Sequence, residues 1–119
     1  MKTASERLKV KGEKMHLKRI LLFAIRYSLF AALIGCSFEY YFNSGVKAKK
    51  PAKKIAHFSK ALSIWKYTDG EKNKANTYIN RGIAYSLLGF YTEALADFDQ
   101  ALNFGKEPAI YYNRAIVYI

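Results

Sequence analysis

The chain has 119 residues, enough for one small domain, and its hydrophobic content of 51% excludes a disordered chain. Its formal net charge of +11 is uneven, because residues 1–74 carry +12 and residues 75–119 carry −1. A basic region can meet nucleic acid or anionic lipid, but this one has no RNA-binding aromatic signature and no zinc-finger spacing, so nucleic acid is not an expected partner. The single Cys excludes an internal disulfide.

The N-terminal part combines a basic stretch with an apolar one. Residues 1–19 are polar and basic, and we expect a disordered leader, with Met15 as an alternative start. Residues 20–38 are apolar apart from Arg26. As a helix they would span about 28 Å, close to the roughly 30 Å core of a bilayer. Arg26 costs about 2.5–3.5 kcal/mol at mid-membrane, but it could snorkel toward the basic flank. The pattern predicts a membrane anchor or signal segment at residues 20–38, with membrane lipid as its partner.

The sequence LIGC at residues 33–36 resembles a bacterial lipobox, in which the Cys, here Cys36, is lipidated. Three interpretations remain open: a lipid anchor at Cys36 facing the periplasm, an uncleaved single-pass anchor, and a packed helix in water. The first two predict a membrane-associated protein. Lys and Arg number 6 in residues 5–19 and 5 in residues 43–57, so the positive-inside rule barely selects an orientation.

The clearest pattern lies in residues 75–107, which read as two amphipathic helices with a break at Gly89. On each side of the break one helix face carries residues at i, i+4 and i+7: Tyr78, Gly82 and Tyr85, then Ala94, Phe98 and Ala101. The small residues allow two helices to approach closely, and the aromatic rings fill the space beside them. One pair of helices cannot bury such faces alone, so the pattern predicts further copies.

These residues resemble the tetratricopeptide repeat, a helical hairpin of 34 residues with an aromatic-Gly-Tyr pattern, then Ala-Phe-Ala, and a Pro near the end. Pro108 fills the last slot, whereas Arg81 departs from the Leu that the family usually has before the Gly. The resemblance implies an all-α fold of antiparallel helical hairpins, a short α-solenoid, preceded here by the N-terminal hydrophobic helix. It also implies a protein-binding scaffold, and together with the lipobox it suggests a bacterial tetratricopeptide lipoprotein.

Residues 39–64 match the same pattern as a divergent, short repeat. Tyr41, Asn43, Gly45, Phe58 and Ala61 fill the corresponding slots. The step from Gly45 to Phe58 is 13 residues, whereas the step from Gly82 to Phe98 is 16, so we expect a turn shortened by three residues. A basic amphipathic helix at residues 52–64, lying on a membrane surface, is the alternative. Residues 65–74 are expected to form a polar linker with a turn at Asp69-Gly70.

Residues 108–119 begin a third copy at an offset of 33 residues, with Pro108 at the expected helix start. The matching residues are Tyr111, Asn113, Arg114, Ala115 and Tyr118. The partner helix of this copy is absent from the sequence, so this is the first helix of an incomplete repeat. Either the chain is a truncated product, or this helix packs on another subunit, which predicts self-association through residues 108–119.

In the family that the chain resembles, the first helices of the repeats line a concave groove. The corresponding peptide-binding slots are Phe42, Asn43, Ile79, Asn80, Ile83, Tyr112, Asn113 and Ile116. The recurring Asn amide both donates and accepts, so it could pair with any peptide backbone. The alternative is that Asn stabilises the hairpin turn locally. Ile79 and Ile83 stand where a carboxylate-tail clamp would need polar groups, so we expect an apolar protein or peptide partner.

No motif in the sequence indicates an enzyme. His16 and His57 are isolated, and neither a Gly-rich phosphate loop nor a nucleophile motif is present. The sequence therefore predicts no catalytic residue, no metal and no cofactor. Asp97 and Asp99 are expected to be solvated on different helix faces. The first alternative function is a structural module that builds an oligomer through the C-terminal helix at residues 108–119, without peptide recognition. The second is binding of anionic lipid or nucleic acid by the basic residues 47–54.

Overall fold

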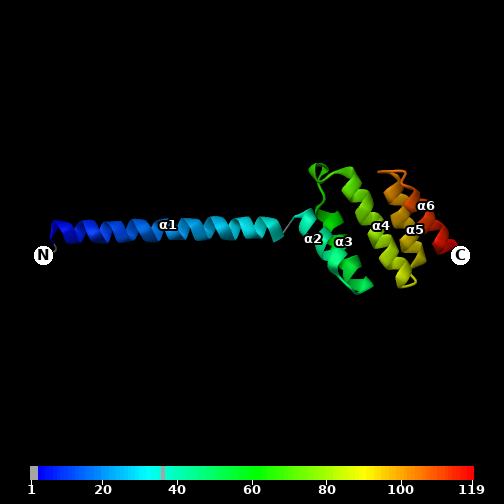
Figure 1. Ribbon diagram of the computed structural model, residues 1–119, viewed down its shortest axis with the longest axis horizontal. Coiled ribbons are helices and arrows are strands. Elements are labelled where there is room, and N and C mark those ends of the chain that lie inside the picture. Colours follow the sequence, from blue (N-terminus) through cyan, green and yellow to red (C-terminus); the bar gives the residue numbers. More distant parts are fainter. Residues whose placement is uncertain (1–2, 36) are drawn as a thin grey trace. The chain divides into compact units, whose positions relative to one another are not determined.

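The computed structural model describes residues 3–35 and 37–119, and this part of the chain is all-helical, without strands, as the sequence predicts. The chain divides into two units, one ending at Ile34 and one beginning at Gly35. Helix α1 (Ala4–Gly35), apart from its last residue, lies in the first unit, and five further α-helices and a short 3₁₀ helix lie in the second (Figure 1).

Helix α1 begins at a capping box formed by Thr3 and Glu6. The Thr3 backbone N donates to Glu6 Oε2 at 3.0 Å, and the Glu6 backbone N donates to Thr3 Oγ1 at 3.3 Å. Each bond satisfies a backbone donor that has no partner within the helix. Residues 4–19 lie within α1 and are helical, whereas the sequence analysis predicts a disordered leader there.

The apolar stretch of α1 is exposed along its described length. The large apolar side chains from Ile20 to Phe30 are exposed, with Phe23 at 72%. Among the described residues, no helix is both long and apolar enough to cross a membrane. The predicted anchor at residues 20–38 includes Cys36, which lies outside the described residues together with its predicted lipidation.

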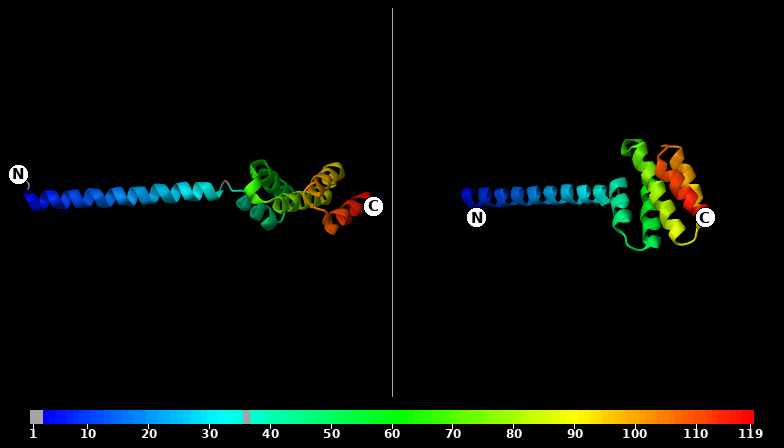
Figure 2. Two further views of the ribbon diagram at one scale, coloured as in Figure 1. Left: turned by 90° about the horizontal axis from the view of Figure 1, so that it is seen from above. Right: turned by 45° about the vertical axis from the view of Figure 1, so that its right-hand side comes forward.

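The second unit is a row of helices in which each packs against the next. Its elements are α2 (Phe38–Lys47), α3 (Pro51–Ile64), η1 (Tyr67–Asp69), α4 (Glu71–Leu87), α5 (Tyr91–Leu102) and α6 (Pro108–Tyr118). The α-helices run in alternating directions, side by side, and α4 also contacts α6 (Figures 1 and 2). The unit therefore consists of two antiparallel hairpins, α2–α3 and α4–α5, followed by α6.

Local sequence signals explain where these helices begin and end. The Ser37 hydroxyl caps α2 by accepting from the Tyr40 backbone N at 3.1 Å. Pro51 and Pro108 stand in the first turns of α3 and α6, where the missing N–H costs nothing. Gly89 has a φ of 81°, a left-handed conformation that lets the chain turn directly after α4.

Both hairpins are built around the same contact between a Gly and a Phe. A Cβ added at Gly45 would lie 2.6 Å from Phe58 Cε1, and a Cβ added at Gly82 would lie 2.7 Å from Phe98 Cε1. Both Phe side chains are 1% exposed. Each ring therefore fills the space that the missing side chain leaves, and the paired helices can approach closely.

The shortening of the first hairpin lies in its first helix and not in its turn, so the prediction of a tightened turn is wrong. The two turns, residues 48–50 and 88–90, have the same length, and Phe58 and Phe98 occupy the same position in α3 and α5. Helix α2 ends soon after its Gly, at Lys47. Lys54 Nζ donates to the carbonyl oxygens of Gly45 at 3.2 Å and Val46 at 3.1 Å, which satisfies two acceptors at this early helix end.

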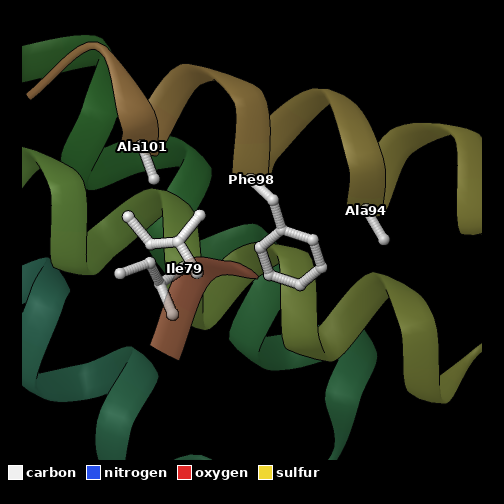
Figure 3. Close-up of a cluster of buried hydrophobic side chains, with 5 residues drawn as sticks. Ile79, Ala94, Phe98 and Ala101 are labelled. Atoms are coloured by element: carbon white, nitrogen blue, oxygen red, sulfur yellow. The ribbon is translucent and has the colours of Figure 1, made fainter. Parts of the chain in front are cut away.

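The core of the second hairpin extends into α6. Ile79 of α4 packs with Ala94, Phe98 and Ala101 of α5 and with Ile110 of α6 (Figure 3). Ile110 is fully buried. Burial of one Ile side chain stabilises a fold by about 1.5–3 kcal/mol, so α6 is part of the same core as the α4–α5 hairpin.

The joint between the hairpins is more ordered than a polar linker over residues 65–74 would be. It contains η1, and α4 begins at Glu71, within the predicted linker. The Trp65 indole N–H donates to the Gly70 carbonyl at 3.1 Å. Lys74 Nζ lies 4.0 Å from the Trp65 ring centroid and 4.9 Å from that of Phe104, within cation–π distance of both rings. The Lys74 ammonium thus links the joint to the end of the α4–α5 hairpin.

Candidate functional site

The predicted groove residues differ widely in their exposure. Ile79 is 9% exposed and belongs to the core, so it offers a ligand little surface. Tyr112 and Ile116 of α6 are exposed at 68% and 48%. The other predicted residues are exposed or half-buried: Phe42, Asn43, Asn80, Ile83 and Asn113.

Two of the predicted residues, Asn80 and Ile83, line a hollow of about 200 Å³ between α4 and the α2–α3 hairpin. We call it the α4 hollow; its lining residues are Val46, Lys54, Phe58, Asn80, Ile83, Ala84 and Leu87. Val46 and Leu87 are exposed at 51% and 68%. Because the Lys54 ammonium is engaged by backbone carbonyls, the amide of Asn80 is the polar group best placed to meet a ligand there.

Asn43 and Phe42 line a different hollow, of about 410 Å³, between α2 and the joint at η1. Its other lining residues are Phe38, Glu39, Thr68, Asp69 and Asn73. Several of these polar groups bond one another or the joint, since the Asn73 amide donates to the Asp69 carbonyl at 2.7 Å and the Asp69 carboxylate accepts from the Lys66 backbone N at 2.7 Å. The structure thus separates Asn43 from Asn80, which the sequence places in one groove.

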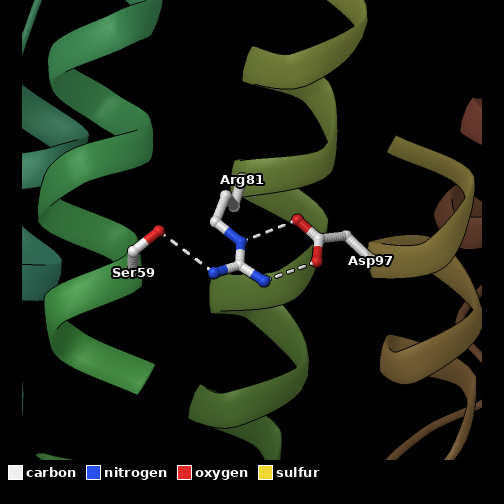
Figure 4. Close-up of polar contacts among 3 residues, drawn as sticks. All are labelled: Ser59, Arg81 and Asp97. Carbon is white, nitrogen blue, oxygen red and sulfur yellow. Dashed lines mark hydrogen bonds and ion pairs between the residues drawn. The ribbon is translucent and has the colours of Figure 1, made fainter. Parts of the chain in front are cut away.

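Arg81, the residue that departs from the repeat pattern, ties three helices together (Figure 4). Its Nε donates to Asp97 Oδ2 at 2.8 Å and its Nη2 donates to Asp97 Oδ1 at 2.7 Å, a bidentate pair between α4 and α5. Its Nη1 donates to Ser59 Oγ of α3 at 3.0 Å. The Asp97 side chain is only 5% exposed. The prediction that Asp97 is solvated is therefore wrong.

The surroundings of Arg81 keep it charged. The hydrogen bonds to Asp97 raise the pKa of Arg81 above its ordinary value, although burial acts in the opposite direction. The rings of Tyr78 and Tyr85 lie 5.6 Å and 5.8 Å from its guanidinium carbon. One sequence signal points to the pair, because Arg81 and Asp97 directly precede Gly82 and Phe98, two residues of the repeat pattern.

The contact between Arg81 of α4 and Ser59 of α3 has a counterpart between α6 and α5. Arg114, the counterpart of Arg81 at the offset of 33, has its Nε 3.3 Å from Asp99 Oδ1. Asp99 directly follows Phe98, as Ser59 directly follows Phe58. Consecutive hairpins are thus joined by equivalent contacts, which indicates a structural role for both arginines.

The titratable side chains do not gather into a metal site in the part of the chain that the structure describes, where no group of three or more His, Cys, Asp or Glu residues could hold a metal ion. The Arg81–Asp97–Ser59 network joins a guanidinium, a carboxylate and a hydroxyl by three hydrogen bonds. A network of this kind holds the helices that it joins in place.

No protein-family model matches the sequence, and separate comparisons with curated proteins and with solved structures found no significant match. The resemblance to the tetratricopeptide repeat therefore rests on the residues and contacts of this chain alone.

Proposed function

We propose that this protein is a scaffold of tetratricopeptide-like repeats that binds an apolar peptide segment of a partner protein in the α4 hollow. The single observation that carries the proposal is the environment of Asn80. Its half-buried amide lines an apolar hollow and, within the described residues, makes no side-chain hydrogen bond. An unpaired amide beside apolar walls suits a peptide whose backbone bonds the amide while an apolar side chain enters the hollow.

The contacts of Asn80 also bear on the alternative that Asn stabilises the hairpin turn. Side-chain hydrogen bonds near the end of α4 come from Ser86, whose hydroxyl donates to the Ile83 carbonyl at 2.7 Å. The described part of the structure shows no such bond from Asn80, so a ligand-binding role explains its placement better than a local capping role.

The assignment to tetratricopeptide-like repeats is supported by two kinds of contact that occur more than once along the chain. One is the Gly–Phe contact within each hairpin, at Gly45–Phe58 and Gly82–Phe98. The other is the contact of an arginine with the preceding hairpin, made by Arg81 with Ser59 and by Arg114 with Asp99. Stacked repeats with equivalent neighbour contacts are the basis of solenoid architecture.

A membrane tether through α1 is the second part of the proposal. The exposed apolar side chains between Ile20 and Phe30 follow a basic stretch, and an apolar helix surface of this kind associates with lipid or with another apolar surface. Intact mass of the protein from its native membrane tests this part. A mass beginning at acylated Cys36 or including residues 1–35 supports a tether, whereas recovery only in the fraction without membranes contradicts it.

The binding proposal is tested by selecting ligands from a phage-displayed library of random 12-residue peptides on the full chain. Asn80→Ala and Ile83→Ala should each weaken the selected peptides about tenfold, since a lost hydrogen bond or apolar contact of about 1.4 kcal/mol has that effect. Asn103→Ala is the matched control, because Asn103 is exposed at the end of α5 and lies away from the hollow. Peptides that bind all three variants as tightly as the wild type would contradict the proposal.

A further inference from the structure

The turn between α2 and α3 and the turn between α4 and α5 lie at the same end of the second unit (Figures 1 and 2). Val46 near the end of α2, Lys54 near the start of α3 and Leu87 at the end of α4 line one hollow, so these helix ends are neighbours. Both turns lie at helix ends, away from the faces through which consecutive helices pack. The two turns can therefore contact one broad surface together.

The turn between α2 and α3 is strongly basic. Lys49 and Lys50 lie in this turn and Lys53 lies in the first turn of α3, and all three residues are exposed. Residues 40–68 contain seven Lys and neither Asp nor Glu. Both ion pairs in the described part of the chain are made by arginines, one between α4 and α5 and one between α5 and α6. The three lysines are therefore available to an anionic partner.

The turn between α4 and α5 exposes large apolar side chains. Leu88, Phe90 and Tyr91 are exposed at 43%, 51% and 55%. Glu93 is the acidic residue nearest to them in sequence, and it places one negative charge against the three lysines. Lysines beside exposed aromatic and aliphatic side chains suit a membrane surface, where ammonium groups meet lipid phosphates and apolar groups enter the acyl boundary. A nucleic acid would pair with the lysines but would offer Leu88 no apolar surroundings.

We propose that this end of the second unit docks on the surface of a bilayer that contains anionic phospholipid. We call the docking surface the turn end, and its residues are Lys49, Lys50, Lys53, Leu88, Phe90 and Tyr91. The lysines bind lipid phosphates, and the three apolar side chains enter the interface. None of these residues lines the α4 hollow or belongs to α1, so the inference rests neither on the proposed peptide binding nor on the proposed tether.

The test uses the full chain with Cys36→Ser and one introduced Cys that carries an environment-sensitive NBD fluorophore. The fluorophore is attached through Tyr91→Cys at the start of α5 or, as the control, through Asn103→Cys directly after α5. Vesicles of phosphatidylcholine and phosphatidylglycerol in equal parts should shift the emission at position 91 to shorter wavelength, saturably, and leave the emission at position 103 unchanged. Vesicles of phosphatidylcholine alone should shift neither, because they carry no net negative charge.

Substitutions within the turn end should weaken this response. Lys49→Gln, Lys50→Gln and Lys53→Gln together should raise the lipid concentration for the half-maximal shift at least tenfold, since three contacts with lipid phosphates are lost. Leu88→Ser should raise it severalfold, because less apolar surface enters the interface. All of these residues are exposed, so the fold should be kept, and circular dichroism checks the helical content of each variant.

A matched control removes the same charge at the opposite helix ends. Lys66, Lys72 and Lys106 are exposed there, and their combined replacement by Gln should change the half-maximal lipid concentration by less than about twofold, because salt screens distant charges. Equal losses from the two sets of lysine substitutions would overturn the proposal, because the net charge and not the turn end would then cause binding.

The fluorophores and the lipid composition provide the remaining outcomes. An unshifted fluorophore at position 91 on anionic vesicles, or equal shifts at positions 91 and 103, would overturn the proposal. So would tighter binding of a single-stranded oligonucleotide than of vesicles by the same three lysines, which would make nucleic acid the partner. Co-sedimentation with vesicles, measured on the same samples, reports the tether through α1 separately: sedimentation without a shift at position 91 keeps the tether and overturns this proposal.

Discussion

The ring of Phe98 occupies the space beside Gly82 that any side chain at position 82 would need, since a Cβ there would lie 2.7 Å from Phe98 Cε1. The ring is buried on α5 and cannot move aside without disturbing the core that it shares with Ala94 and Ala101. The equivalent contact between Gly45 and Phe58 makes this the repeated packing unit of the protein.

Gly82→Ala should therefore destabilise the second unit. Overpacking against a fixed ring costs about 1–3 kcal/mol. The intrinsic helix preference of Ala over Gly returns at most about 1 kcal/mol. We expect a net loss of about 1 kcal/mol in the free energy of unfolding, measured by urea denaturation with Trp65 fluorescence.

Two controls accompany this substitution. In a Phe98→Leu background the cost of Gly82→Ala should fall by about half or more, because the ring is gone. Gly12→Ala should leave the unfolding of the second unit unchanged, since Gly12 lies in α1 and no described atom is within 4 Å of its Cβ position. A stabilising Gly82→Ala would show that the helices separate easily and that the contact is not a packing constraint.

The Arg81–Asp97 pair predicts strongly coupled substitutions. Arg81→Leu leaves the carboxylate of Asp97 buried without a cation, and we expect a loss of about 3–5 kcal/mol in the free energy of unfolding. The double substitution with Asp97→Leu should be much less harmful than Arg81→Leu alone, because no buried charge remains.

A double-mutant cycle measured by denaturant unfolding checks this prediction. Ser59→Ala is the matched control: it removes the third contact of Arg81 but no charge, so it should cost only about 1 kcal/mol. Additive effects of the two Leu substitutions would contradict a direct interaction between Arg81 and Asp97.

Lys74 contacts the rings of both Trp65 and Phe104, and we expect these two cation–π contacts to stabilise the second unit. Lys74→Met keeps much of the side-chain length but removes the charge, and it should cost about 0.5–2 kcal/mol in the free energy of unfolding. Lys74→Arg should retain most of the stability, because a guanidinium also binds aromatic faces. Since Trp65 is the only Trp in the chain, its emission spectrum should change with Lys74→Met. Equal stability of the Met and wild-type chains would show that the cation–π contacts contribute nothing.

The sequence predicts those parts of the fold in which spacing alone determines the contact. The i, i+4 and i+7 spacing identifies the helix faces that contain Gly82 and Phe98. Matching residues elsewhere in the sequence identify the further copies that contain Gly45 and Ala115. The turn of the first hairpin could not be placed, because a three-residue deficit between Gly45 and Phe58 fits a short helix as well as a short turn. Helix formation in residues 4–19 does not follow from the polar, basic composition on which the prediction of a disordered leader rests, whereas Thr3 and Glu6 have the spacing of a capping box.

The candidate site was less predictable than the fold. Asn80 and Ile83 do line one hollow, but Ile79, one position before Asn80, turns into the core, and Asn43 reaches a second hollow. Equivalent residues meet different neighbours, since Asn43 lies beside the joint at η1 whereas Asn80 lies beside the α2–α3 hairpin. The role of Asp97 was missed because its partner, Arg81, stands where the repeat pattern has an apolar residue.

The measurement that tests the central claim most directly is NMR of the isotope-labelled full chain during titration with a peptide selected from the 12-residue library. The account predicts that the side-chain amide signals of Asn80 and the backbone signals of Ile83 and Leu87 shift together and saturate at one peptide per chain. Shifts confined to α6 or to the hollow beside Asn43, with the Asn80 amide unmoved, would contradict it.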